Sequence, residues 1–186
     1  MILRDAVEAD YPEIIDLANV AYRKTGPGSS WNSEEGLIAG HRLTDSLLRD
    51  EFAHKPEAHL LVYRETPEGP LLGTVWLEPK KSEAKSPDLT NEAASTWYLG
   101  LLTVRPDQQA RGLGKTILAA AENFVRAHGG SRIRMTVLHV RTTLIAWYER
   151  RGYTLTGETE PWHYDDQRFG TPLRDDLYFV VMEKSL

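Results

Sequence analysis

The residues best suited to bind a charged ligand form a stretch punctuated by glycine. The stretch reads Gln109, Ala110, Arg111, Gly112, Leu113, Gly114, Lys115. An apolar run precedes it at 97–104, and an apolar-periodic run follows it, so the order predicts a buried strand, a tight loop and a helix that begins at the glycines. Backbone N–H groups at a helix N-terminus are unpaired and can bind phosphate without a basic side chain. We therefore expect a phosphate-bearing ligand at residues 109–114.

Two well-known phosphate loops share part of this pattern and fail on specific residues. Gly114-Lys115-Thr116 matches the end of a P-loop, but Gln109 stands where that motif needs its first glycine. Gly112 and Gly114 match the start of a dinucleotide fingerprint, but Ile117 occupies the third glycine position. Neither nucleotide motif is therefore present.

The elements that must position this loop are predicted from periodicity and turn residues. Strands are expected at 1–5, 60–63, 71–77, 97–104, 132–138, 153–156 and 177–182, and helices from about residue 10, at 112–128 and at 142–150. Asn32 and Glu35 have capping-box spacing and predict a short helix, and Thr44 is expected to cap a second one. The polar residues 79–95 and the irregular residues 161–176 are expected to be surface loops. Gly100, inside the apolar strand, indicates either a bulge or a close ligand approach, or a simple relief of packing.

Composition limits the class of protein. A chain of 186 residues with 41% hydrophobic and 26% charged residues predicts one globular domain spanning 1–186. No apolar run is long enough to cross a membrane, and residues 1–5 lack a signal-peptide core, so we expect a cytoplasmic protein without a membrane partner. The absence of cysteine excludes thiolate metal sites and a cysteine nucleophile, and no metal is expected. The net charge of -5 argues against a nucleic-acid partner.

Residues 97–153 resemble the acetyl-CoA-binding half of the GCN5-related N-acetyltransferases. The resemblance rests on the strand ending in Leu102-Thr103-Val104, the loop 109–114, and the helix around Tyr148 that closes with Gly152-Tyr153. It implies an α/β fold with a mixed, mostly antiparallel sheet, a splayed central pair of strands and flanking helices. It also implies acetyl-CoA as co-substrate, with its pantetheine arm on Leu102, Thr103 and Val104 and its pyrophosphate on residues 109–115. A backbone N–H aimed at the thioester oxygen would stabilise the charge that develops there.

The resemblance also suggests residues for the chemistry. It implies that Tyr148 protonates the leaving thiolate, although the same residue could be a core aromatic paired with Leu144. Arg141 replaces an asparagine common in the family, and whether it contacts cofactor, contacts substrate or caps the helix stays open. Thr136 falls where some members carry a glutamate base, so His139, Glu78 and then Glu34 are our candidates for that role.

The acceptor pocket is expected from residues 29–45 and 161–176. Its candidate residues are Trp31, Glu34, Trp162 and Tyr164. Aromatic and acidic side chains there could bind a cationic amine, or the aromatics could simply pin a solvated loop to the sheet. We therefore expect an N-acetyltransferase acting on a primary amine of a small molecule, by direct attack in a ternary complex. A non-catalytic acyl-CoA-binding module and a protein N-acetyltransferase are the alternatives, and a homodimer is one option for the oligomeric state.

Overall fold

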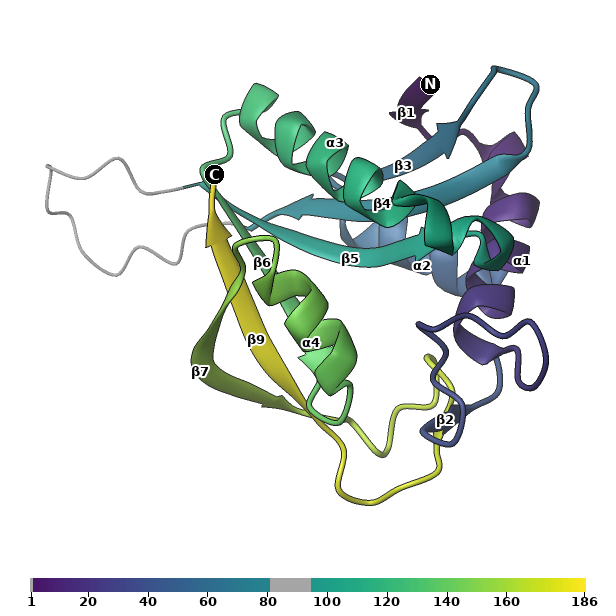
Figure 1. Ribbon diagram of the computed structural model, residues 1–186, viewed down its shortest axis with the longest axis vertical. Coiled ribbons are helices and arrows are strands. Elements are labelled where there is room, and N and C mark those ends of the chain that lie inside the picture. Colours follow the sequence, from purple (N-terminus) through teal and green to yellow (C-terminus); the bar gives the residue numbers. More distant parts are fainter. Residues whose placement is uncertain (1, 81–94) are drawn as a thin grey trace, which may run out of the picture.

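The computed structural model describes residues 2–80 and 95–186 (Figure 1). Its main sheet has seven strands in the order β1-β3-β4-β5-β6-β9-β7. Their bounds are β1 (Ile2–Asp5), β3 (His59–Arg64), β4 (Leu71–Pro79), β5 (Thr96–Val104), β6 (Arg132–Leu138), β7 (Thr154–Pro161) and β9 (Tyr178–Ser185). Neighbouring strands pair antiparallel except β5 and β6, which pair parallel. The expected mixed, mostly antiparallel α/β fold is confirmed. The predicted loop at 79–95 lies, from 81 to 94, outside the described residues.

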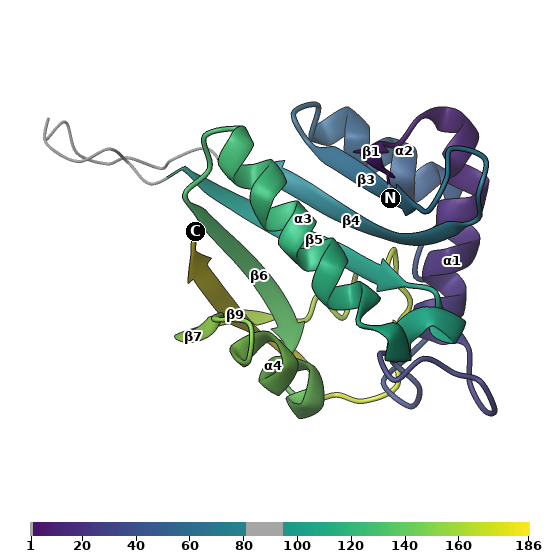
Figure 2. The same cartoon turned by 45° about the horizontal axis from the view of Figure 1, so that its top comes forward.

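The parallel pair β5–β6 opens after one short stretch of pairing. Its partners are Thr96 with Arg132, Trp97 with Ile133 and Tyr98 with Arg134. Beyond them β5 continues to Val104 and β6 to Leu138 without pairing to each other, and Figures 1 and 2 show the two strands running apart. The expected splay is therefore present, and it leaves one edge of each strand free of its neighbour.

A bulge in β5 bends the strand where the splay begins. Trp76 of β4 faces Gly100, whereas Thr74 faces Thr103, so two β5 residues lie opposite Val75. One of them, Leu101, has a φ of 48°, in the left-handed region that costs a non-glycine residue about 1–2 kcal/mol. Because bulges bend a strand and increase its twist, this one helps β5 to diverge from β6. Both interpretations of Gly100 have support, because the bulge follows it directly and a Cβ at Gly100 would lie 2.9 Å from the ring of Tyr98.

Helices cover both faces of the sheet. They are α1 (Tyr11–Arg23), α2 (Asp45–His54), α3 (Leu113–Ala127) and α4 (Thr142–Glu149), with short 3-10 turns η1 (Glu8–Asp10) and η2 (Pro106–Arg111). In Figure 2, α3 and α4 lie on one side of the sheet, and α1 and α2 on the other. One apolar core includes Ile117 and Val125 of α3 with Leu99 and Ile133 of the sheet. A second core includes Ile14 and Leu17 of α1, Leu48 of α2, and Leu60 and Trp76 of the sheet. No helix in the described ranges is long and apolar enough to span a membrane.

The segment before α2 differs from the prediction. Residues 31–37 form turns, so the helix expected from Asn32 is wrong. The serine hydroxyls decide the local structure, because the N–H of Asn32 donates to Ser30 Oγ at 3.0 Å and that of Glu35 donates to Ser33 Oγ at 3.2 Å. The expected cap of α2 is confirmed, since Thr44 Oγ1 accepts from the N–H of Leu47 at 3.2 Å. A two-stranded sheet, β2 (Ile38–Ala39) with β8 (Thr171–Pro172), joins this segment to the distant 161–176 region.

Candidate active site

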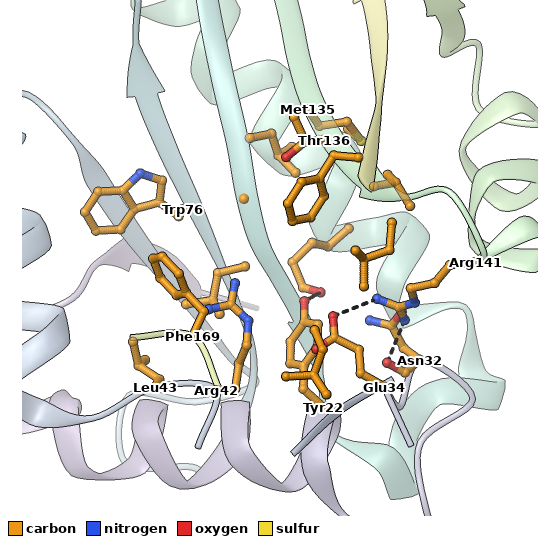
Figure 3. A pocket seen from close by; sticks show the side chains of 18 of the residues that line it. Tyr22, Asn32, Glu34, Arg42, Leu43, Trp76, Met135, Thr136, Arg141 and Phe169 are labelled. Carbon is orange, nitrogen blue, oxygen red and sulfur yellow. Dashed lines mark hydrogen bonds and ion pairs between the residues drawn. The ribbon is translucent and has the colours of Figure 1, made fainter. Parts of the chain in front are cut away.

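A cavity of about 360 Å³ occupies the gap between the diverging strands. Residues 98–102 of β5 form one wall and residues 135–138 of β6 form the other. The floor comes from α1 and the turns after it, including Tyr22, Asn32 and Glu34. Figure 3 shows these side chains with Trp76 and Phe169 around the β5 strand. The splay thus converts a potential strand–strand contact into a cavity, which we call the larger pocket.

A smaller pocket of about 80 Å³ lies at the glycine loop and helix α4. Its lining includes Gly112, Gly114 and Lys115 of the loop and Trp147 and Arg151 of the α4 end. Both pockets are lined by Asn32, Leu102, Leu144 and Tyr148. The two pockets are therefore neighbours along one gap and meet at the end of β5.

The free edge of β5 carries backbone groups toward this gap. The carbonyl of Leu102 accepts from Tyr22 Oη at 3.2 Å, and that of Val104 accepts from Gln109 Nε2 at 3.3 Å. Side chains thus take the positions that a neighbouring strand would occupy. In a strand the N–H and C=O of one residue point to the same edge, so the N–H groups of Leu102 and Val104 lie on that edge too. The middle residue, Thr103, is fully buried and faces Thr74 of β4.

The glycine loop has the backbone geometry that the phosphate prediction requires. Gly112 has a φ of 75° and is the N-cap residue of α3, and an added Cβ there would meet nothing within 4 Å. A Cβ at Gly114 would lie 3.4 Å from Trp147 and 3.6 Å from Val104, so glycine keeps the slot between β5 and α4 open. The first-turn N–H groups of Leu113 and Gly114 have no carbonyl one turn earlier within α3. The loop therefore offers unpaired donors beside the smaller pocket.

The side chains around the loop have different surroundings. Lys115 and Arg151 line the smaller pocket, whereas Arg111 is exposed and donates to Gln108 Oε1 at 2.8 Å. Leu113 packs against the core, and Ala110 lies in η2. The structure thus brings Lys115 to the pocket and leaves Arg111 on the outside.

Gln109 and Trp31 fix the loop to the segment after α1. Gln109 Nε2 donates to Ser30 Oγ, and Gln109 Oε1 accepts from the N–H of Trp31 at 3.3 Å. The Trp31 ring lies 6.2 Å from that of Trp147, centroid to centroid. Trp31, expected at the acceptor, therefore lines the smaller pocket beside the loop.

Tyr148 lies where the two pockets meet, and its ring is 6% exposed. Rings of Trp147 and Tyr153 pack edge-on against it at 5.0 and 5.6 Å. Its hydroxyl has no hydrogen-bond partner within residues 2–80 and 95–186. Burial raises the pKa of the Tyr148 phenol above its ordinary value near 10, and Tyr22 raises it further, while Arg141 opposes the shift. The phenol therefore stays protonated at physiological pH and is available as a proton donor.

Arg141 belongs to a buried ionic cluster on the wall of the larger pocket. Its guanidinium donates to the carbonyl of Asn32 at 2.7 Å and to Asn32 Oδ1, and lies 3.4 Å from Glu34 Oε1. Glu34 also pairs with Arg23, whose Nη2 donates to the carbonyl of Phe169 at 2.7 Å. Arg141 occupies the N-cap position of α4, but its side chain makes no capping hydrogen bond. The cluster joins α1, the turn segment, α4 and the 161–176 region around the pocket.

The structure does not bring the other base candidates into either pocket. His139 stacks on Tyr178 at 3.8 Å between ring centroids and lies outside both linings. Glu78 pairs with Lys80 at 2.9 Å and Lys55 at 3.6 Å and also lies outside them. Geometry therefore gives no support to His139 or Glu78 as the base. The part of the chain that the structure describes contains no group of three histidine or carboxylate side chains that could hold a metal ion.

The two aromatic candidates of the 161–176 region have separate positions. Trp162 is buried, stacks on Phe179 at 5.5 Å and lines the larger pocket. Tyr164 is 39% exposed, lines neither pocket, and its hydroxyl accepts from the N–H of Leu177 at 2.7 Å. Tyr164 thus pins the loop, which is one of the two alternatives expected from the sequence.

Sequence reasoning missed several residues of the site. Tyr22 and Arg151 line the pockets but lie outside the segments expected there. Asn32 and Arg42 lie inside the expected segment 29–45 but were not singled out as candidate site residues. Only Tyr22 could have been found from the sequence, because its polar hydroxyl stands out on the otherwise apolar stripe of α1. The others reach the gap only through tertiary packing.

Comparisons with known proteins agree with this geometry. The family model described as Acetyltransferase (GNAT) family matches residues 14–153. A proposed acetyltransferase of the GNAT family from Desulfovibrio desulfuricans has a similar fold, with a TM-score of 0.65 at 16% identity over 99% of this chain and 98% of that one. A proposed acetyltransferase from Salmonella typhimurium, solved with acetyl-CoA, also has a similar fold. Its TM-score is 0.65 at 20% identity, over 100% of this chain and 94% of that one.

A third similar structure is the spermidine N-acetyltransferase SpeG of Vibrio cholerae, solved as a single-site mutant. Its TM-score is 0.63 at 15% identity, over 100% of this chain and 95% of that one. A search of curated proteins finds no match. At these identities the solved structures establish the fold, and the family model, which covers most of the chain, establishes the family. The chain belongs to the GNAT family of acetyltransferases.

Proposed function

We propose that this protein transfers acetyl from acetyl-CoA to the primary amine of a small molecule, by direct attack in a ternary complex. The observation that carries the proposal is the meeting of two pockets at Leu102 and Tyr148. One pocket has the donors for a phosphate-bearing co-substrate, and the other is a separate chamber for an acceptor. Acetyl-CoA, when bound, supplies an activated acetyl thioester.

The residues of the smaller pocket fit the co-substrate. The loop N–H groups and the positive end of α3 suit a pyrophosphate, and Lys115 and Arg151 add positive charge. The free edge of β5 at Leu102 and Val104 suits an extended amide-bearing arm, which would pair with it like an added strand. An N–H on this edge that faces the thioester oxygen would stabilise the negative charge developing there, a type of contribution worth about 2.7–4 kcal/mol in acyl transfer.

Tyr148 is our proposed general acid. The phenol is protonated, so its O–H at the junction of the pockets can donate to the departing thiolate and supply the proton as the C–S bond breaks. The raised pKa makes Tyr148 a weaker acid than a free phenol, so its O–H acts mainly as a hydrogen-bond donor that stabilises the developing charge on sulfur.

The amine must lose a proton, and no free carboxylate lines the larger pocket in the described residues. Glu51 pairs with Lys55 at 2.5 Å, Asp166 with Arg168 at 2.7 Å, and Glu34 with two arginines. Each of these carboxylates would therefore have to give up a cationic partner to accept the proton. We propose that water accepts the proton, so that the acceptor reacts as its free amine. His163 also lines the larger pocket, and it is the protein side chain that would act as the base if water does not.

A small acceptor fits the larger pocket better than a protein terminus. The 161–176 region and the turns after α1 close over it through the bond from Arg23 to Phe169 and through β2–β8. A cavity of about 360 Å³ is within the usual range for small-molecule sites. The spermidine enzyme of similar fold also acts on a small amine.

Thiol release from acetyl-CoA tests the proposal. The pure protein is incubated with acetyl-CoA and a panel of small amines and peptides, and free CoA is followed over time. We expect acetyl-CoA to raise the melting temperature and small amines to release thiol. Cofactor binding without turnover would favour the non-catalytic module, and turnover confined to peptides would favour a protein N-acetyltransferase. No thermal shift with acetyl-CoA would contradict the assignment of the smaller pocket.

A further inference from the structure

The charges of the larger pocket suggest which chemical class of amine it accepts. Five cationic side chains line it, compared with three carboxylates. The cations are Arg23, Arg42, Lys55, Arg141 and Arg168, and the carboxylates are Glu34, Glu51 and Asp166. The lining therefore has an excess of positive charge, although the whole chain has a net charge of -5.

Every carboxylate of the lining already has a cationic partner. Glu34 pairs with Arg23 and Arg141, Glu51 with Lys55, and Asp166 with Arg168. A cationic group on the substrate would therefore have to displace an existing ion pair. The pocket offers no ready anionic site for a second positive charge.

Arg42 is the exception among these cations. Within residues 2–80 and 95–186 its guanidinium has no carboxylate partner. It lies over the ring of Tyr22, 5.3 Å from the centroid, and over that of Phe169 at 5.5 Å. Figure 3 shows Arg42 beside Phe169 and near Tyr22. Two aromatic faces hold the cation but leave its N–H groups without an anionic acceptor.

The backbone of Arg42 is also fixed. Its N–H donates to Asn19 Oδ1 at 2.7 Å, and Asn19 Nδ2 donates to the carbonyl of Leu43 at 2.8 Å. This anchors the residue to α1. The guanidinium is thus presented from a rigid base, as specific recognition of an anion requires.

Tyr22 connects this guanidinium to the reaction centre. The face of its ring receives Arg42, and its hydroxyl donates to the carbonyl of Leu102, where the two pockets meet. An anionic group on Arg42 would therefore be about one tyrosine ring away from the thioester position. A short molecule that carries both an amine and an anion can span that distance.

We propose that the acceptor is a small amine bearing a carboxylate, of the amino acid type, with its carboxylate on Arg42 and its apolar part among the aromatic side chains of the pocket. A planar guanidinium matches a carboxylate with two parallel hydrogen bonds. Trp76, Phe169 and Phe179 provide apolar surface for the rest of the molecule. This inference rests on the proposed function, because it assigns the acceptor of the same site.

Matched acceptors test the inference. Phenylalanine, phenylalaninamide and phenethylamine share one ring and differ in the carboxylate, and thiol release gives kcat/KM for each at a pH chosen for equal free-amine concentration. We expect kcat/KM of phenylalanine to exceed that of the two analogues without a carboxylate by about 10- to 150-fold, the range for a hydrogen bond to a charged group. In Arg42→Gln this preference should disappear, with an unchanged KM for acetyl-CoA. Arg42→Lys should restore part of it.

Arg49→Gln is the matched control. Arg49 also lies over a tyrosine ring, 5.4 Å from the centroid of Tyr11, but it is on α2 outside both pockets. The control should keep the wild-type preference. Binding of N-acetylphenylalanine, measured by calorimetry, gives a readout without turnover and should weaken in Arg42→Gln alone.

The outcomes separate the two proposals. Equal turnover of all three acceptors, or equal loss for all three in Arg42→Gln, overturns the carboxylate assignment and leaves the acetyltransferase proposal intact. If polyamines are turned over and amines that bear a carboxylate are not, the carboxylate assignment is likewise overturned and the acetyltransferase proposal stays intact. If acetyl-CoA neither binds nor releases thiol with any acceptor, the proposed function fails. In that case, binding of N-acetylphenylalanine that still depends on Arg42 would support the anion site even though the acetyltransferase proposal is wrong. Binding that does not depend on Arg42 would overturn both proposals.

Discussion

The Tyr148 hydroxyl combines two properties that a proton donor needs. It lies at the junction of the two pockets, and it has no hydrogen-bond partner within the described residues that would compete for its proton. Its neighbours Trp147 and Tyr153 fix the ring by edge-on packing. If Tyr148 were only a core aromatic, its ring would be enough and its hydroxyl would not matter. Removal of the hydroxyl alone therefore distinguishes a proton donor from a core residue.

Tyr148→Phe is expected to lower kcat by about 100-fold, because general acid catalysis contributes at least that much in many enzymes. The KM for acetyl-CoA should change little, since the ring and its packing remain. Steady-state thiol release measures both values. Tyr11→Phe on α1, outside both pockets, is the control and should behave as wild type. An unchanged kcat in Tyr148→Phe would assign the tyrosine to the core alone.

The pH profile should report the acceptor amine and not a protein base. We expect kcat/KM to rise with pH up to the pKa of the amine used and then to level off. The raised pKa of Tyr148 means that its acidic form is present below that pKa and is lost only above it. No descending limb should therefore occur up to about pH 10, the ordinary tyrosine pKa. Two acceptors of different pKa should shift the rising limb accordingly, and a limb that stays fixed would indicate a protein base.

At the scale of elements, α3 has a positive-φ glycine just outside each end. Gly112 precedes it with a φ of 75°, and Gly129 follows it with a φ of 79°. An added Cβ meets nothing within 4 Å at either position. The two sites thus share backbone strain and free space, and only Gly112 faces the smaller pocket.

Alanine at each glycine separates helix termination from phosphate binding. Both Gly112→Ala and Gly129→Ala should destabilise the fold by about 1–2 kcal/mol, the cost of a Cβ in the left-handed region, as measured by urea unfolding. Only Gly112→Ala should weaken acetyl-CoA binding, by about 10-fold or more by calorimetry, because its Cβ enters the space where the phosphate approaches. Equal affinities in the two variants would remove the phosphate assignment from this loop.

At the scale of the whole molecule, one buried carboxylate joins three elements. Asp10 pairs with Arg4 of β1 at 2.7 Å and with Arg64 of β3 at 3.1 Å, and it accepts from the N–H of Val7 at 2.8 Å. It directly precedes α1. The hydrogen bond from Arg4 lowers the pKa of Asp10 well below its usual range, assisted by Val7 and Arg64 and opposed by burial. Its ionised form is thus the one that the fold stabilises.

Acid should weaken this junction. Because the folded pKa is depressed, the contribution of Asp10 is complete above the unfolded pKa of about 4 and is lost as pH falls below it. Asp10→Asn should therefore cost about 1.5–3 kcal/mol at neutral pH and progressively less from about pH 5 to pH 3, measured by urea unfolding. Asp50→Asn, an exposed site on α2, should be nearly neutral throughout. A cost in Asp10→Asn that does not vary with pH would show that the ionised form is not specially stabilised.

Local chemistry predicted much of this architecture. Alternating and helical patterns indicated the strands of the main sheet and three of the four helices, but not β2 and β8, and Gly112 marked the start of α3. Thr44 was recognised as the cap of α2 because a cap depends only on residues within one turn. The same rule failed at Asn32, where Ser30 and Ser33 hydroxyls bind the backbone first. Short-range rules thus succeed only where no neighbouring side chain competes.

The acceptor site could not be predicted in the same way. His139 and Glu78 had suitable side chains, but His139, which follows β6, and Glu78, near the end of β4, lie outside both pockets. Arg42 lies in the expected segment 29–45, but nothing singled it out there, since its role depends on Tyr22 from α1 and Phe169 from a region more than 120 positions away. Trp31 lies at the smaller pocket because its N–H donates to Gln109 Oε1, a contact between residues 78 positions apart. Such placements follow from packing between distant segments.

The sequence by itself determined the family resemblance and the glycine loop at which we propose that the co-substrate binds, because the strand, glycine loop and helix start are consecutive and their backbone geometry is set locally. Only the tertiary structure decided how the larger pocket, our proposed acceptor site, is built. The splay of β5 from β6 opens it, and pairing of each carboxylate with a nearby cation leaves Arg42 available. Charge balance within a cavity depends on which distant side chains share it, and only folding brings them together.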